Sequence, residues 1–114
     1  MAEVKPPSVR SVKAALRKAG HAEAVTSGSG REKRVVTAGF HAWTLGGEVR
    51  VTHWTKTLPA GFDTPQTWAR EQDEQRRKLA AYAEVLKAAG WKIVDASRGR
   101  QPGYLAVLAP GGAR

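Results

Sequence analysis

The chain has 114 residues and no cysteine, and its 19 Lys and Arg against 10 Asp and Glu give a formal net charge of +9. That length allows one hydrophobic core and excludes a multidomain enzyme, and without cysteine neither a disulfide nor a thiolate zinc site can form. No apolar run approaches the roughly 20 residues of a membrane span, and no apolar signal core stands near the N-terminus. We therefore expect a cytoplasmic protein with no membrane partner.

Residues 8–19 are predicted to form the first helix. Apolar residues recur there at helical spacing, Ser8 can cap the N-terminus, and Gly20 stands where a helix often ends in a left-handed residue. On a helical wheel, basic side chains cluster beside the apolar stripe. We expect this helix to present a basic outer face made by Arg10, Lys13 and Arg17.

The next segments are predicted to be strands. A short strand is expected at residues 22–26, followed by a loop over residues 27–34. Residues 35–45 and 49–56 are rich in Val, Thr, Phe and Trp, which favour strands. The two glycines between them supply the positive φ angles that a tight hairpin turn requires. We therefore expect an antiparallel hairpin here.

A long helix is predicted from Pro65 to about Ala89. Thr64 can cap it, proline suits the first helical position, and Gly90 suits the residue after its end. Its C-terminal half carries one apolar stripe, but residues 70–78 are wholly polar, so this part is expected to lie in solvent or against a partner. Opposite charges four residues apart can stabilise such a helix. The pairs at this spacing are Asp73 with Arg77 and Glu74 with Lys78.

Two further strands are predicted at residues 91–97 and 104–108, joined by a basic loop. The order is then α-β-β-β-α-β-β, which predicts an α+β fold with an antiparallel sheet of about five strands and two helices on one face. We expect this single domain to span residues 8–109. Residues 1–7 are expected to be a flexible arm and residues 110–114 a frayed tail.

The hairpin register gives the predicted sheet two different faces. One face carries mainly apolar side chains and should pack on the helices. The other carries His41, Trp43, Arg50 and Trp54, with Trp54 opposite Gly39 and with Trp43 opposite Arg50, where a cation–π contact can form. This second face can stabilise the hairpin, lie in a dimer interface or stack with a ligand.

No catalytic set and no metal site are predicted. His41 and His53 fall on opposite sheet faces in this register, so they are not expected to share a metal ion. The sequence shows no paired carboxylates, no nucleophile beside a base and no phosphate-binding glycine loop. We therefore expect a protein without enzymatic activity, cofactor or metal.

The excess positive charge is spread unevenly along the chain. Residues 1–20 carry five positive charges and one negative, and residues 98–114 carry three and none. If the first three strands form a meander, connectivity places the loop 27–34, the loop 98–103 and the start of the first helix at one end of the sheet. This shared basic end is expected to contact phosphates. The candidate contacts are Arg10, Lys13, Arg17, Arg31, Lys33, Arg34, Arg98 and Arg100.

The α-β-β-β-α order over residues 8–89 resembles that of double-stranded RNA-binding domains, which place two helices on one sheet face. That family reads RNA with a lysine cluster that opens the second helix, whereas this chain has Thr-Pro-Gln-Thr-Trp at residues 64–68. The resemblance implies the arrangement of elements and no functional residue. The Leu-Lys-Ala-Ala-Gly-Trp sequence at residues 86–91, followed by a terminal hairpin, is similar in style to small proteins of actinobacteria and their phages, which implies no activity.

Two functions stay open from the sequence. The first is a small basic nucleic-acid-binding accessory protein that contacts DNA or RNA phosphates through its loops and bases through Trp43, Trp54 and Arg50. The alternative is a protein-interaction module, either a phage-type modulator with an acidic protein partner or a homodimer, that uses the tryptophan face or the polar half of the second helix. Affinity for polyanions that falls steeply with salt favours the first, and a salt-insensitive dimer favours the second.

Overall fold

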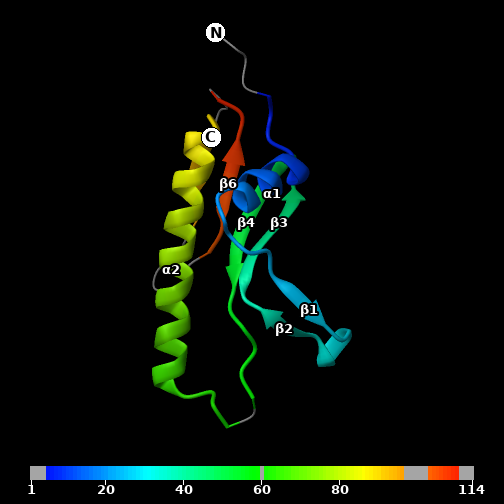
Figure 1. The fold of residues 1–114 in the computed structure, drawn as a ribbon, viewed down its shortest axis with the longest axis vertical. Helices are drawn as coiled ribbons and strands as arrows, with labels where there is room; N and C mark the ends of the chain where they lie inside the picture. Colours follow the sequence, from blue (N-terminus) through cyan, green and yellow to red (C-terminus); the bar gives the residue numbers. More distant parts are fainter. Residues whose placement is uncertain (1–4, 60, 97–102, 111–114) are drawn as a thin grey trace.

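The four-stranded antiparallel sheet at the centre of the molecule has the strand order β3-β4-β6-β5 (Figure 1). The computed structural model describes residues 5–59, 61–96 and 103–110. The sheet consists of β3 (Gly39–Leu45), β4 (Glu48–Trp54), β5 (Lys92–Asp95) and β6 (Leu105–Leu108), and its helices are α1 (Val9–Lys18) and α2 (Pro65–Ala88). A separate two-stranded ribbon pairs β1 (Val25–Ser27) with β2 (Arg34–Thr37) through the 3-10 turn η1 (Gly30–Glu32).

Helix ends and the hairpin turn lie where the sequence predicts them. Ser8 and Thr64 cap α1 and α2 through hydrogen bonds to backbone N–H groups three residues later. Gly20 and Gly90, one residue past the C-caps, have φ angles of +91° and +99°. The β3–β4 turn has two glycines at positive φ, and its register runs from Leu45 opposite Glu48 to Gly39 opposite Trp54, as predicted.

Both helices pack on one face of the four-stranded sheet, and alternation along the strands explains which residues that face buries. The predicted core-face residues of the β3–β4 hairpin are buried, and β6 adds the next row. The described core consists of Val12 and Leu16 from α1, Leu79, Tyr82 and Leu86 from α2, and Phe40, Ala42, Val49, Val51, Leu105 and Val107 from the sheet.

The α+β class is confirmed, but the expectation of a single five-stranded sheet is wrong. The predicted strand at residues 35–45 is divided at Ala38 into β2 and β3, and β2 leaves the main sheet to pair with β1 (Figure 1). Val36, which strand alternation would place on the core face of an unbroken strand, is 40% exposed in the ribbon.

The division follows from a close passage of residues 22–24 along β3. Phe40 donates its N–H to the Ala22 carbonyl and accepts from the Ala24 N–H, which forms a short parallel bridge at the sheet edge. A Cβ atom at Gly39 would lie 2.4 Å from the Ala22 carbonyl oxygen, so only glycine fits there. Gly39 and His41 are two residues apart on β3, so both face the side of the sheet opposite the helices. Residues 22–24, which lie against Gly39, therefore cross toward that side, and the ribbon follows them.

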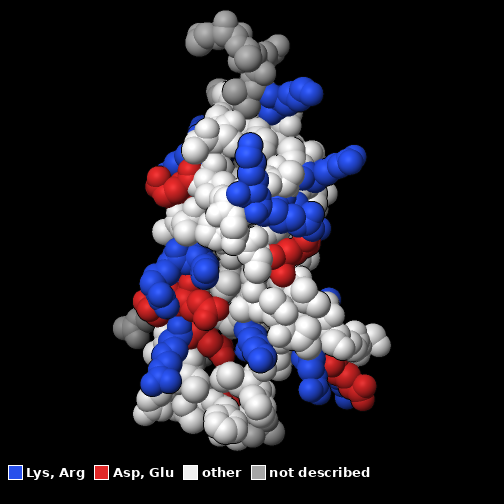
Figure 2. Space-filling model, in the orientation of Figure 1, with Lys and Arg blue, Asp and Glu red and all other residues white. Residues whose placement is uncertain are grey.

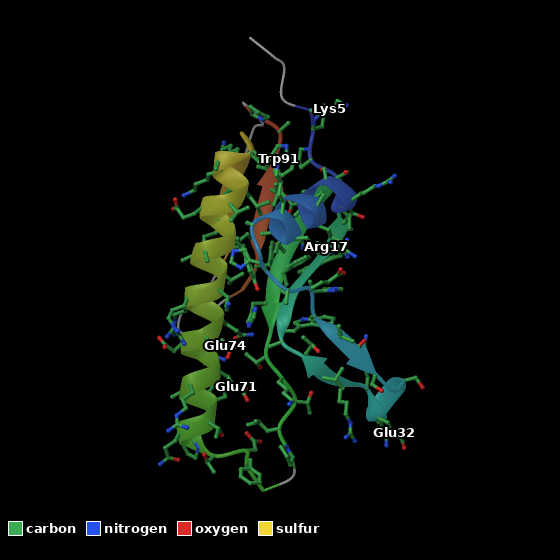
Figure 3. The ribbon with its side chains drawn as sticks, in the orientation of Figure 1. Lys5, Arg17, Glu32, Glu71, Glu74 and Trp91 are labelled. Atoms are coloured by element: carbon green, nitrogen blue, oxygen red, sulfur yellow. The ribbon has the colours of Figure 1, made fainter. Side chains whose placement is uncertain are left out.

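The start of α1 lies at the opposite end of the sheet from the ribbon, which corrects the predicted shared basic end. The Trp91 indole N–H donates to the Lys5 carbonyl at 2.9 Å. Lys92, the next residue, pairs with Leu108 at the end of the sheet where the β3–β4 turn lies. Figure 3 shows Lys5 and Trp91 together and far from Glu32 at the ribbon tip. The predicted position of the α1 start was wrong because the first strand does not join the sheet as a meander. Residues 1–4 of the predicted arm and 111–114 of the predicted tail lie outside the described residues.

The N-terminal half of α2 extends past the end of the sheet (Figure 1). Asp73 and Arg77 form the predicted ion pair, with 3.1 Å between Arg77 Nε and Asp73 Oδ2. Glu74, expected to pair with Lys78, contacts His53 of β4. Neither of the two described helices has the length and apolarity that a membrane crossing needs.

Substitution of Gly39 tests the close passage. Gly39→Ala is expected to destabilise the protein by about 2 kcal/mol or more, because the added methyl group meets backbone that cannot move cheaply. Gly46→Ala is the control: its φ is +63° but nothing lies within 4 Å of the added Cβ, so it should cost only about 1 kcal/mol. Urea unfolding followed by circular dichroism measures both. Equal losses for the two variants would contradict the proposed crowding at Gly39.

Candidate nucleic-acid interface

The sheet face opposite the helices carries a row of aromatic rings. The predicted members His41, Trp43 and Trp54 all lie on this face and are half-buried. Tyr104, just before β6, joins them, although the sequence analysis did not single it out. Strand alternation places Tyr104 on this face only once the β4–β6 register is known, and that pairing is not visible in local sequence.

The rings of this row contact one another face to face. Trp54 and His41 stack with centroids 3.9 Å apart and an interplanar angle of 16°, and His41 and Trp43 stack at 5.4 Å and 20°. Tyr104 meets Trp43 at 6.1 Å in an edge arrangement. The inner ring faces are therefore used within the protein, and the stack contributes to stability as cross-strand aromatic contacts do.

Arg50 is held by partners other than the predicted one. It pairs with Trp43 in the β-sheet register, but its guanidinium lies over the Tyr104 ring, 4.5 Å from the centroid. Arg50 Nε also donates to Glu48 Oε1 at 2.9 Å, two residues earlier on the same face. The neighbouring carboxylate offsets much of the charge of Arg50, which makes this residue less available to a base or a protein partner than the sequence suggested.

His41 is kept neutral in the stack. Burial between the tryptophans lowers the His41 pKa below its ordinary value, and the nearby Lys13 and Lys33 lower it further against the opposing effect of Glu23. The stack at neutral pH is therefore an uncharged surface with cations near it.

The predicted phosphate contacts of the ribbon lie beside this aromatic row. Arg31, Lys33 and Arg34 are all exposed on η1, β2 and the residue between them. The Lys33 ammonium lies over the Trp54 ring, 5.6 Å from its centroid. The structure thus brings together two predicted groups that are separated in the sequence by some twenty residues.

Two adjoining grooves open along the ribbon. The first has a volume of about 360 Å³ and lies between the ribbon and the segment that follows β4; it is lined by Thr26, Lys33 and Arg34 on one side and by Trp54, Thr57 and Gln75 on the other. The second, of about 340 Å³, shares Lys33, Arg34 and Thr57 with the first and adds the charged residues Arg31 and Glu32. The ribbon cations therefore border a continuous depression.

The predicted contacts on α1 are less available for phosphate. Lys13 Nζ lies 2.8 Å from Glu23 Oε2, and the Arg17 guanidinium pairs with the other oxygen of the same carboxylate. The hydrogen bond from Lys13 is the main cause of a lowered Glu23 pKa. Figure 2 shows Lys and Arg gathered over α1, on the helix side of the molecule, where Arg10 is exposed. Arg98 and Arg100 lie outside the described residues.

A buried polar chain links α2 to β4 below the grooves. His53, 2% exposed, has Nδ1 at 2.7 Å from the Tyr82 hydroxyl and Nε2 at 2.7 Å from Glu74 Oε2. Since a carboxylate can only accept, Nε2 carries the proton, and Nδ1 accepts from the Tyr82 hydroxyl. Burial raises the Tyr82 pKa, with a smaller contribution from Glu74, so this hydroxyl stays protonated.

The arrangement of this chain fits a structural role. His53 and Tyr82 are buried and Glu74 reaches His53 from the edge of the core, with 38% of its side chain exposed. His41 lies on the other sheet face, as the sequence predicted. Among the described residues no three His, Asp or Glu side chains are grouped to hold a metal ion. The sequence placed His53 on the core face but gave no signal for its partners, because α2 had no defined register against the sheet.

The titration of His53 gives a pH-dependent stability. Burial lowers the His53 pKa below 6.5, with Lys78 adding to the shift and Glu74 opposing it. The unfolded chain therefore binds more protons below pH 6.5, so the contribution of His53 to stability is complete above that pH and is lost as the pH falls through the lowered folded-state value. Between about pH 7.5 and about pH 5.5, wild type should lose more unfolding free energy than His53→Gln, by at most about 1.4 kcal/mol per pH unit. Urea unfolding at both pH values measures this, and equal losses would contradict it.

Comparisons with protein-family models, with curated proteins and with solved structures found no match. The function must therefore be inferred from the geometry of the described residues. The feature with the clearest chemical meaning is the place where exposed cations of the ribbon meet an aromatic ring of the sheet.

Proposed function

We propose that the protein is a small basic nucleic-acid-binding accessory protein, without enzymatic activity, whose main contact surface is the β1–β2 ribbon. The observation that carries this proposal is the position of the Lys33 ammonium over the Trp54 ring, at a groove that Arg34 also lines. Cations next to an aromatic ring suit a ligand that combines phosphates with flat bases. Nucleic acid is the polymer with that chemistry.

The ribbon supplies the electrostatic part of the affinity. Arg31, Lys33 and Arg34 are exposed, so each can neutralise a phosphate and release a condensed counterion. Three such contacts give a slope of about −2 in a plot of log affinity against log salt for a single strand. The net charge of +9 adds long-range attraction to any polyanion.

The α1 surface has a smaller part in this proposal. Lys13 and Arg17 share the carboxylate of Glu23, so binding a phosphate there means competing with an existing ion pair. Arg10 is exposed and lies toward the end of the sheet opposite the ribbon. A ligand that covers the ribbon need not reach it.

The alternative, a protein-interaction module, is favoured by a different observation. Leu58, Phe62 and Trp68 are exposed by 38%, 59% and 47% around the start of α2, where the helix extends past the sheet. Exposed apolar side chains of this size are typical of a contact with another protein. This second candidate predicts association that responds to Trp68→Ser and not to salt.

Charge removal on the ribbon tests the proposed function. The variant Arg31→Gln, Lys33→Gln, Arg34→Gln is expected to weaken binding of labelled single-stranded DNA, duplex DNA or RNA at low salt by about tenfold or more, because three counterion-releasing contacts are lost. Fluorescence anisotropy at two salt concentrations measures the affinity and its salt slope.

A matched variant removes the same net charge from the helices, Lys18→Gln, Arg77→Gln, Lys87→Gln, and it should bind within about threefold of wild type. Equal weakening of both variants would mean that only net charge matters. No binding by wild type at low salt would overturn the proposal, and a salt-insensitive dimer in sedimentation would support the protein-interaction alternative.

A further inference from the structure

We propose that the groove beside Trp54 binds one unpaired base, which stacks on the indole face that Lys33 now covers, while Lys33 and Arg34 hold the adjoining phosphates. The ligand class is therefore single-stranded nucleic acid, or an unpaired base within a longer one. This inference rests on the proposed function and makes it more specific.

The ring contacts show why the site is at Trp54. One face of the Trp54 indole is filled by the His41 ring at 3.9 Å, and Trp43 is occupied by His41 and Tyr104. Because the His41 ring already occupies the first face, we infer that the Lys33 ammonium, 5.6 Å from the Trp54 centroid, lies over the other face. Trp54 is also one of the residues that line the first groove.

The Lys33 side chain covers this face of Trp54, and a ligand can displace it. Its side chain is exposed and long, so moving its ammonium costs little beyond a weak cation–π contact of about 0.5 to 1 kcal/mol. A base that enters the groove gains a stacking contact on the indole, and the displaced ammonium can turn to the phosphate of the same nucleotide. The free protein thus keeps the ring face shielded from other contacts.

The size and lining of the groove fit one nucleotide. Its volume of about 360 Å³ is at the small end of ligand pockets, which run from roughly 300 to 1,000 Å³. None of its described lining residues carries a carboxylate, and Thr26 and Thr57 add hydroxyl groups. A base in a duplex would first have to leave its stack, at a cost of a few kcal/mol, so unpaired bases are favoured.

The neighbouring grooves indicate the path of the backbone. The second ribbon groove adds Arg31 and Glu32, so its lining past Lys33 and Arg34 keeps an excess of positive charge, with three cations and one carboxylate. On the α2 side, a smaller groove of about 180 Å³ is lined by Glu71 and Glu74 together with two cations, so it offers phosphates no net attraction. Figure 3 shows both glutamates pointing from α2 toward the segment after β4. From the groove beside Trp54, the nucleic-acid backbone is thus expected to continue along the ribbon.

The test compares a short labelled oligothymidylate with an oligomer of the same length made of abasic nucleotides, which has the same phosphates and no bases. Wild type should bind the oligothymidylate about fivefold or more tightly, which is the contribution of one stacked base. Trp54→Leu should remove this preference while keeping the affinity for the abasic oligomer. Trp43→Leu, which opens the same aromatic row away from the groove, should keep the preference.

A second readout does not depend on the Leu variants folding. Oligothymidylate should quench tryptophan emission in wild type and in Trp43→Phe, but much less in Trp54→Phe, because the stacked base lies on that ring. Duplex DNA of equal charge should quench none of them.

The outcomes separate this inference from the proposed function. Equal affinity for the two oligomers, equal quenching by duplex, or equal loss of preference in Trp43→Leu and Trp54→Leu would overturn the stacking site while salt-dependent binding still supports the function. No binding of either oligomer at low salt would overturn both.

Discussion

The close passage of residues 22–24 against Gly39 is the constraint on which the rest of the interface depends. It carries the chain from the helix side of the sheet toward the opposite face, and it ends the long strand that the sequence suggests at Ala38. The ribbon then begins beside the aromatic row, so that Lys33 reaches Trp54. A side chain at Gly39 would close this route.

Local sequence signals predicted the individual helices, caps and turn of this protein. Contacts between distant segments determine how these elements are arranged. The caps at Ser8 and Thr64, the glycine turn and the β3–β4 register depend on neighbours in sequence, and these predictions are confirmed. The position of the ribbon, the end at which α1 starts and the partner of Arg50 depend on contacts between distant segments, such as Trp91 with Lys5. Periodicity contains no information about those contacts.

Our proposal gives the aromatic face two roles that the sequence left as alternatives. The stack of His41 between two tryptophans is a stabilising arrangement, as the structural interpretation required. Each stacked contact occupies one face of each of two rings. Only a ring at an end of the row can therefore keep a face for a ligand. One end of this row faces Tyr104 and the other faces the ribbon, so in our proposal the role in stability defines where the role in binding can be.

The hydrogen bonds of His53 have a consequence for the mechanics of the groove. They tie Glu74 and Tyr82 of α2 to β4, and Gln75 donates to the His53 carbonyl at 3.1 Å while also lining the groove. Directional bonds of this kind hold the overhanging half of α2 at a fixed distance from the sheet. The side of the groove that Gln75 lines is thus fixed to the core. In our proposal, a nucleic-acid strand therefore binds a groove whose width is preorganised.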